Sequence, residues 1–261
     1  MINIKDIEKI IKAAGDIVLN ADESKMEIDS KQGIGNFVTY YDKKVQSFLR
    51  EELLKVLPEA NFVGEEEELH SEIKEKGYTF IVDPIDGTAN FTKRFSVSAV
   101  SIALLKDGEP YIGVCLNPYT NELYTAKRGE GAYLNGEKIK VSEKKMSEAL
   151  IMSGSAPYYP EMRELSLKAF SAFFANCADY RRFGAAVLDL CLVACGKAEL
   201  FYEVILQPWD YAAGMLIVEE AGGKVSTMKG EKLRFDRPCS ILASNNQEDY
   251  LKYINNLFIE V

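Results

Sequence analysis

The chain has 261 residues, 47% of them hydrophobic and 27% charged, which is enough to bury one large core or the cores of two fused lobes. Forty acidic residues against 31 Lys and Arg give a formal charge of -9, which argues against a general surface for nucleic acid or anionic membrane. Five cysteines without a C-x-x-C pair fit no closed disulfide framework and favour a reduced, cytoplasmic setting.

Other classes are disfavoured by what the sequence lacks. No stretch reaches the ~18 apolar residues of a membrane span, and the first residues do not have the pattern of a secretion signal. The only histidine, His70, lies in the acidic run GEEEELHSE, which nearly excludes histidine-based zinc sites and Ser-His-Asp triads. We therefore expect a cytoplasmic protein with no membrane partner and no nucleic-acid partner.

The first part of the chain combines two helices with short strands. Residues 3–21 and 45–57 place apolar side chains at helical steps, so each segment predicts an amphipathic helix. Between them, SKQGIGNFVTYYD predicts a glycine-containing loop and a short strand, and YTFIVDP predicts a strand that ends at its proline. From Phe95 onward, runs separated by turn residues and the Asn-Gly turn of AYLNGEKIKV predict an antiparallel meander.

After Leu150 strand-like and helical runs alternate, with helices expected at about 160–176, 184–196, 209–223 and at the C-terminal end. The fold class is therefore α+β, with layered sheets and helices. The change of pattern at residues 146–150 suggests an N-terminal α+β lobe over 1–145 and a C-terminal α/β lobe over 146–261.

Two aspartates follow a buried strand in VDPIDGTANF. A stiff turn with proline can hold Asp83 and Asp86 toward one point, although an ordinary turn in which Asp86 caps a helix is the alternative. Carboxylates without histidine or thiolate select hard cations, Mg²⁺ or Mn²⁺. Gly87 and Thr88 could present backbone N–H groups to a phosphate oxygen. Asp210, in QPWDYAAGM, could be an N-cap or a further ligand.

The fragments GEE, DPIDGT and WDxAAG, in this order and in a chain of this length, resemble the inositol monophosphatase family of Mg²⁺-dependent phosphomonoesterases. The match runs from Lys31, past TYYD, to EEAGG, and so covers nearly the whole chain. The resemblance implies a layered α-β-α-β-α sandwich of the sugar phosphatase type, with the active site between the two lobes. It also implies lithium sensitivity and a homodimer.

Position by position, the resemblance implies that Glu65, Asp83 and the Ile85 carbonyl hold one metal and that Asp83, Asp86 and Asp210 hold a second. Two or three Mg²⁺ ions would occupy each site, with Mn²⁺ as an alternative. Thr88 and Asp42 would orient and help to deprotonate the attacking water, with Glu66 as a candidate assistant. The substrate-binding positions that the resemblance implies are Lys31, Asp86, Gly87, Thr88, Ser155, Gly184, Ala185, Ala186 and Glu203.

Three of these features bear on the substrate. Glu203 matches the acid that accepts hydrogen bonds from polyol hydroxyls in inositol-type members, although a charge at a strand end is the alternative. Ala185 stands where the family often has serine or threonine, which removes a possible hydroxyl contact. Arg182 could meet a second phosphate, a neighbouring subunit or only solvent.

The function expected from this reading is Mg²⁺-dependent hydrolysis of a small phosphomonoester, first of all inositol monophosphate. Related substrates are fructose 1,6-bisphosphate, NADP, histidinol phosphate and 3′-phosphoadenosine 5′-phosphate. A non-catalytic binding or regulatory homologue is an alternative of another class. A structural Ca²⁺ module is a third, but the EF-hand loop pattern is absent from the sequence.

Overall fold

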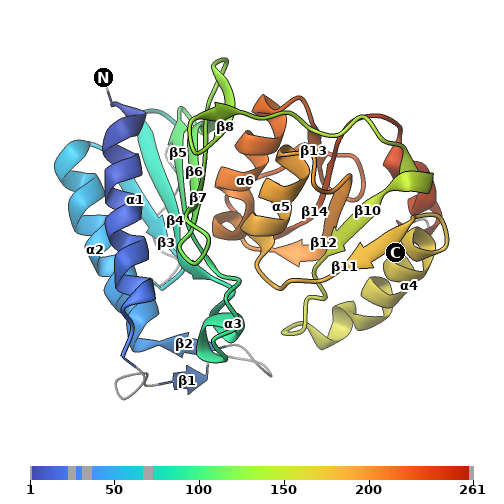
Figure 1. The fold of residues 1–261 in the computed structure, drawn as a ribbon, viewed down its shortest axis with the longest axis horizontal. Coiled ribbons are helices and arrows are strands. Elements are labelled where there is room, and N and C mark those ends of the chain that lie inside the picture. The colour runs from blue at the N-terminus through green and yellow to red at the C-terminus, as the bar shows by residue number, and fades with distance from the viewer. Residues whose placement is uncertain (1, 23–27, 31–36, 67–72, 74, 259–261) are drawn as a thin grey trace.

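Helices and two sheets alternate in five layers, α-β-α-β-α, in the computed structural model (Figure 1). The structure describes residues 2–22, 28–30, 37–66, 73 and 75–258, so Lys31 and His70 lie outside the described residues. The α-helices described are α1 (Ile4–Leu19), α2 (Tyr40–Val56), α3 (Thr88–Thr92), α4 (Arg163–Phe174), α5 (Ala186–Ala194) and α6 (Pro208–Glu220). This order of layers confirms the predicted fold class.

The first sheet has seven strands in the order β3-β4-β5-β6-β7-β8-β9. They are β3 (Asn61–Gly64), β4 (Tyr78–Asp86), β5 (Ala99–Lys106), β6 (Glu109–Asn117), β7 (Glu122–Lys127), β8 (Gly131–Leu134) and β9 (Glu137–Lys138). All neighbours are antiparallel except β3 and β4, which are parallel. The predicted meander is therefore confirmed, with the Asn-Gly turn between β8 and β9.

The second sheet has five strands in the order β11-β10-β12-β14-β13. They are β10 (Leu150–Ser153), β11 (Asp179–Arg181), β12 (Leu200–Leu206), β13 (Lys224–Ser226) and β14 (Cys239–Ser244). Strand β10 is parallel to both β11 and β12, whereas β14 is antiparallel to its two neighbours. A separate two-stranded ribbon pairs β1 (Ile28–Ser30) with β2 (Phe37–Thr39).

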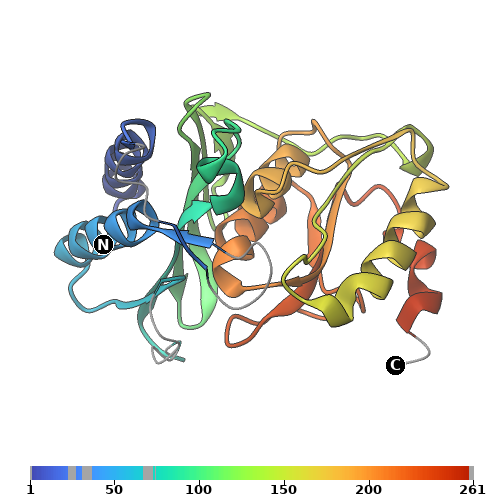
Figure 2. The ribbon, with the colours of Figure 1, turned by 90° about the horizontal axis from the view of Figure 1, so that it is seen from below.

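The outer layer beside the first sheet consists of α1 and α2, which Figure 2 shows lying next to each other on its outer face. Helix α1 begins where the Asn3 side chain accepts a hydrogen bond from Lys5 N at 3.0 Å, and its isoleucines pack inward. Helix α2 begins with a reciprocal capping box between Thr39 and Asp42. Their apolar faces and the sheet form one core cluster.

The middle layer, α5 and α6, fills the space between the sheets (Figure 2). Residues of α6 are buried on every side, as expected for a helix covered by packed layers rather than facing solvent. Small residues let the backbones approach closely: a Cβ at Gly113 on β6 would lie 2.7 Å from the Ala213 carbonyl oxygen. Helix α6 therefore packs directly on the first sheet and contacts β4, β5 and β6.

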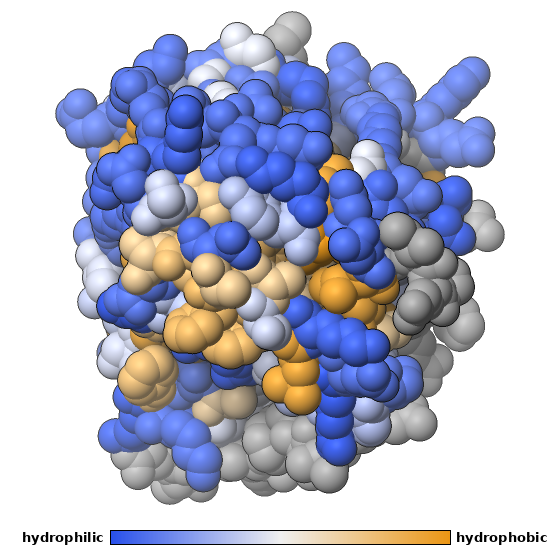
Figure 3. Space-filling view, turned by 90° about the vertical axis from the view of Figure 1, so that its right-hand side faces the viewer, coloured by the Kyte–Doolittle hydropathy of each residue, from blue (hydrophilic) through white to orange (hydrophobic). Residues whose placement is uncertain are grey.

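Helix α4 and two short 3₁₀ turns, Tyr250–Tyr253 and Asn255–Phe258, form the outer layer beside the second sheet. On this side of the molecule apolar side chains gather at the surface (Figure 3), and the exposed large ones on α4 are Leu167, Phe170 and Phe174. The helix predicted at the C-terminal end is present in the described residues as two short 3₁₀ helices rather than one α-helix.

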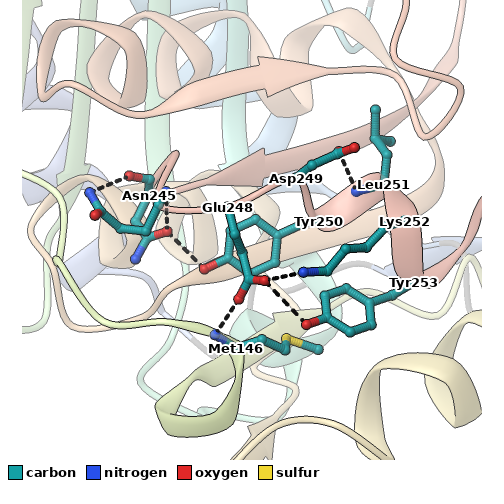
Figure 4. A network of polar contacts seen from close by, with 9 residues as sticks. Met146, Asn245, Glu248, Asp249, Tyr250, Leu251, Lys252 and Tyr253 are labelled. Atoms are coloured by element: carbon teal, nitrogen blue, oxygen red, sulfur yellow. Dashed lines mark hydrogen bonds and ion pairs between the residues drawn. The ribbon is translucent and has the colours of Figure 1, made fainter.

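A polar network holds the segment that connects the two sheets (Figure 4). The carboxylate of Glu248 accepts a hydrogen bond from Met146 N at 2.7 Å, and it also contacts Lys252 and Tyr253. The Asn245 amide donates to the Lys144 carbonyl at 2.7 Å. Residues 146–150, where we predicted a boundary between two lobes, thus begin in a connection that hydrogen bonds attach to Asn245 and Glu248. The division of the chain into two lobes stays a prediction.

Candidate active site

A cavity of about 320 Å³ lies where the carboxyl end of β4, the first turns of α5 and α6, and the end of β12 meet. Acidic side chains line much of its wall: Glu65, Asp83, Asp86, Asp189, Glu203 and Asp210. Arg182 is on the same wall. Segments more than 100 residues apart in the sequence therefore bring their charged groups to one place.

Asp83 and Asp86 both belong to strand β4, which continues through Pro84 to Asp86. The prediction that the strand ends at the proline was wrong. A shift of register against β5 falls between the two aspartates, and such a bulge accommodates a proline and bends the strand. The side chain of Asp83 accepts a hydrogen bond from Ile85 N at 3.0 Å, which fixes the turn of the chain there.

Asp86 connects the first sheet to helix α5. Its two carboxylate oxygens accept hydrogen bonds from Ala186 N at 3.1 Å and Val187 N at 2.7 Å. These N–H groups belong to the first turn of the helix and have no acceptor within the helix itself. The helix dipole also favours a negative charge at this end. Burial nevertheless outweighs these bonds and raises the pKa of Asp86 to about 7.

Asp210 lies in the first turn of α6, where its carboxylate accepts a hydrogen bond from Gln207 N at 2.7 Å. The prediction that Asp210 is the N-cap was wrong, because Gln207 is the N-cap and Asp210 is the third residue of the helix. The Asp210 side chain lines the cavity, and its role as a ligand stays a prediction. Burial, with repulsion from Asp86 and Glu65, raises its pKa well above the usual range. The pKa of Asp83 is raised by burial and by the neighbouring Glu65 carboxyl group.

These raised pKa values have one physical cause: acids gathered in a buried place repel one another unless protons or cations lie between them. An oxygen-only donor set of this kind fits Mg²⁺ or Mn²⁺. Within the part of the chain that the structure describes, no three acidic, histidine or cysteine side chains already form a metal-holding group. The donor chemistry fits a divalent cation, while the exact ligand set stays a prediction.

Asp42 and Thr88 lie beside the acidic wall. The Thr88 hydroxyl donates to Asp42 Oδ1 at 3.1 Å and is also 3.1 Å from the Ile85 carbonyl oxygen. The other oxygen of Asp42 accepts from Thr39 N at 2.7 Å and from the Thr39 hydroxyl at 2.5 Å. Burial raises the pKa of Asp42 to about 6 despite these bonds. At neutral pH this carboxylate can accept a proton through Thr88.

Glu203, in the middle of β12, also lines the cavity. Its Oε1 accepts from Ala156 N at 2.9 Å, and burial raises its pKa to about 7. A Cβ at Gly154 would lie only 1.8 Å from Glu203 Oε2, so this position has no room for a side chain while the carboxylate stays in place. The loop after β10 is therefore shaped around the Glu203 side chain.

The turn before α5 is held against α3 by a side chain. The Asn90 amide donates to the Val97 carbonyl at 2.8 Å and the Phe183 carbonyl at 2.7 Å. Gly87 has a φ of 86°, and a Cβ there would meet the Gly184 and Val97 carbonyl oxygens at 3.1 Å. Gly184, Ala185 and Ala186 thereby form a cavity wall that faces Gly87 and Thr88.

The structure brings most of the expected residues to this cavity. The wall includes Glu65, Asp83, Ile85, Asp86, Gly87, Thr88, Gly184, Ala185, Ala186, Glu203 and Asp210. Three others are not on the wall: Asp42 lies behind Thr88, the Ser155 hydroxyl accepts from Arg182 Nε at 3.1 Å, and Glu66 donates its backbone N–H to Gln46. Lys31 is outside the described residues.

The structure also adds wall residues that the motifs did not identify, among them Gly154, Tyr158 and Asp189. Asp189 had a signal in the sequence, because it is the one charged residue in the apolar run AAVLDLCLVA. Gly154 and Tyr158 had none, since their place depends on how the loop folds around Glu203.

Comparison with known proteins gives consistent results. The family model described as "Inositol monophosphatase family" matches residues 4–258. The protein named "Nus factor SuhB" of Vibrio cholerae is 37% identical over 88% of this chain and 86% of its own length. The protein of Aquifex aeolicus named "Fructose-1,6-bisphosphatase/inositol-1-monophosphatase" is 36% identical over 98% of this chain and 96% of its own.

Solved structures give the same result. The crystal structure of extragenic suppressor protein suhB from Bartonella henselae superposes with a TM-score of 0.89 at 34% identity, covering 99% of both chains. The inositol monophosphatase of Thermotoga maritima superposes with a TM-score of 0.85 at 29% identity, covering 95% of both chains. The chain belongs to the inositol monophosphatase family, with its layered α-β sandwich fold.

Proposed function

We propose that the protein is a Mg²⁺-dependent phosphomonoesterase whose preferred substrate is inositol monophosphate. The observation that carries the proposal is the meeting of Glu65, Asp83, Asp86 and Asp210 at one cavity. Membership of a family of metal-dependent phosphatases supports the same chemistry.

The residues that would hold the metal are those four acids and the Ile85 carbonyl. Mg²⁺ bound there would lower the pKa of water and neutralise the charge of a phosphate group. Without a cation this wall would repel a phosphate, because the acids are buried next to one another. We therefore expect the metal to be needed for binding the substrate's phosphate group as well as for hydrolysing the ester.

The chain's own contribution to hydrolysis is a proton path. The Thr88 hydroxyl donates to Asp42 Oδ1 at 3.1 Å, so its lone pairs can accept a hydrogen from water on the cavity side. As the water oxygen forms its bond to phosphorus, its proton passes to Thr88 and the Thr88 proton to Asp42. The ester oxygen leaves on the opposite side with the electron pair of the broken P–O bond and takes a proton from solvent water, and no phosphoenzyme is formed.

The remaining wall would bind the leaving group. Glu203, on β12, lines the same cavity as the acids of β4 and α6, and the Ala156 backbone N–H donates to its carboxylate. Such an acceptor suits the hydroxyl groups of a polyol. The buried methyl group of Ala185 offers no hydrogen bond, so recognition of hydroxyls would depend on the carboxylates.

Fructose 1,6-bisphosphate is the second candidate substrate. The Aquifex aeolicus relative is named for both activities, and Arg182 supplies the cation that a second phosphate would need. The Arg182 side chain is held toward the cavity by its hydrogen bond to the Ser155 hydroxyl at 3.1 Å. NADP, histidinol phosphate and 3′-phosphoadenosine 5′-phosphate remain in the test panel.

Phosphate release tests the proposal. The purified protein is assayed with Mg²⁺ over that panel, with EDTA and Ca²⁺ in place of Mg²⁺ as controls. We expect Mg²⁺-dependent turnover that EDTA abolishes, fastest with inositol monophosphate. No turnover of any ester with Mg²⁺ or Mn²⁺ would instead support a binding or regulatory homologue. This alternative is worth testing because some relatives carry the name Nus factor rather than the name of an enzyme.

Other properties rest on family membership and stay proposals: a homodimer, inhibition by lithium, two or three metal ions per site and a cytoplasmic location. All five cysteines are free thiols, in agreement with a reducing compartment. In the described residues, no helix combines the length and the apolar character needed to span a membrane.

A further inference from the structure

Asp189 is a buried acidic side chain in the active-site wall, and one of its two oxygens lacks a hydrogen-bond partner in the described part of the chain. It is 1% exposed, and among the described residues nothing donates a hydrogen bond to its Oδ1. Helix α5 around it is otherwise apolar, and its residues from Ala186 to Cys191 are all buried. None of the metal or catalytic roles described above uses this side chain.

The fold does not need a carboxylate at this position. A buried carboxylate that lacks donors lowers stability, whereas an apolar side chain of similar size would add to the core between the two sheets. Neither a cap nor an ion pair accounts for Asp189 in the described part of the chain. A molecule that enters the cavity can supply the missing donor, because Asp189 is on the cavity wall.

The position of Asp189 shows which part of that molecule it would meet. Ala185, the N-cap of α5, and Ala186 and Asp189 in its first turn all line the cavity. The small alanines leave room in front of the carboxylate. Asp86 occupies the N–H groups of Ala186 and Val187, and Asp189 lies at the end of the same first turn.

Glu203 supplies a second acceptor to the same cavity from another element, strand β12. Two carboxylates on separate elements select a ligand with several hydroxyl donors, since a carboxylate accepts hydrogen bonds and donates none. Arg182 is the cation on this part of the wall, but among the described residues it forms no ion pair with either acid. The acids are left available to a ligand.

We propose that Asp189 is a specificity-determining residue that accepts a hydrogen bond from a leaving-group hydroxyl, which makes the preferred substrate a polyol monophosphate. This inference rests on the proposed function, and it adds a residue that the family motifs do not supply. Asp189 would contact the leaving group and so affect which substrate is preferred, whereas the acids of β4 and α6 would hold the metal that binds the phosphate.

The test compares two esters of six-membered rings, myo-inositol 1-phosphate and cyclohexyl phosphate, which differ in the free hydroxyls. In Asp189→Leu, we expect the ratio of kcat/KM for the inositol ester to that for the cyclohexyl ester to fall about tenfold, mainly through KM. Asp189→Asn keeps one oxygen acceptor and should recover part of that ratio. The metal-free Asp189→Leu protein should also have a higher Tm than the metal-free parent.

Three results would overturn the proposal: an equal loss with both esters, a higher Mg²⁺ requirement, or a lower Tm in both variants. The first and third indicate a structural role, and the second indicates a metal ligand. If the parent protein hydrolyses neither ester, the proposed function fails, and calorimetry then decides the role of Asp189. With Mg²⁺, Asp189→Leu should bind myo-inositol 1-phosphate about tenfold more weakly than the parent; equal binding overturns the inference.

Discussion

Asp86 accepts a hydrogen bond from the backbone N–H of Val187, at 2.7 Å, across 101 residues of sequence. The contact joins the end of a strand in the seven-stranded sheet to the first turn of α5 in the middle layer. One side chain therefore satisfies a helix terminus and places a carboxylate on the cavity wall. Its substitution should affect catalysis more than it affects folding.

We expect Asp86→Asn to lower kcat by on the order of 100-fold or more, because an amide holds a cation more weakly than a carboxylate does. The amide oxygen can still accept from one of the two N–H groups of α5, so the circular dichroism spectrum should stay unchanged. Asp16→Asn, on the exposed face of α1, is the matched control and should keep the parent's rate. A near-normal rate for Asp86→Asn would exclude Asp86 as a metal ligand.

Thr88→Val should lower kcat by roughly 100-fold with little change in KM, since it removes the hydroxyl between water and Asp42 and keeps the side-chain shape. Thr88→Ser retains the hydroxyl and should keep most of the rate. Steady-state kinetics of the two variants, with Mg²⁺ saturating, decides the point. The proton path is disproved if valine and serine give the same rate.

Gly154→Ala should raise KM for a polyol phosphate and lower Tm, because the new Cβ would fall 1.8 Å from Glu203 Oε2 in the present arrangement. We expect the double variant Gly154→Ala/Glu203→Ala to recover most of the lost Tm, since truncation of the glutamate makes room. Thermal unfolding of the two single variants and the double variant measures this coupling. Additive losses would show that Gly154 is not required by the Glu203 side chain.

Metal-free protein should become less stable as pH rises from about 4 to 7. Burial raises the pKa of Asp86 from 3.8 to about 7 and that of Glu203 from 4.5 to about 7. In this window the folded state holds protons that the unfolded chain has lost, so the free energy of unfolding falls with rising pH. We expect Mg²⁺ to raise Tm more at pH 7.5 than at pH 5, because it replaces those protons.

Chemical or thermal unfolding at the two pH values, with Mg²⁺ or with EDTA, provides the measurement. In Glu203→Gln without metal, the decline between pH 5 and pH 7.5 should be smaller than in the parent. A Tm of the metal-free parent that rises steadily to pH 7.5 would contradict the raised pKa values.

The sequence predicted those features that depend on local pattern. The periodic isoleucines of α1 and the run WDYAAGMLIVEEAGG of α6 gave the helices, and the aspartates of VDPIDGT marked the acidic wall. Strand β4 continues past Pro84 because its pairing with β5 shifts register there, which no local signal shows. The fit between Gly154 and Glu203, and the missing partner of Asp189, depend on packing between distant elements.

Helix α6 comes from the second half of the chain, yet it covers the inner face of the sheet built by the first half. A fragment that stops at residue 145 would expose β4, β5 and β6 to water on that side and would lack Asp210. Such a fragment should aggregate rather than fold. Exchange of halves between two relatives would place α6 of one parent on the sheet of the other, so it would succeed only where the side chains at this contact fit each other.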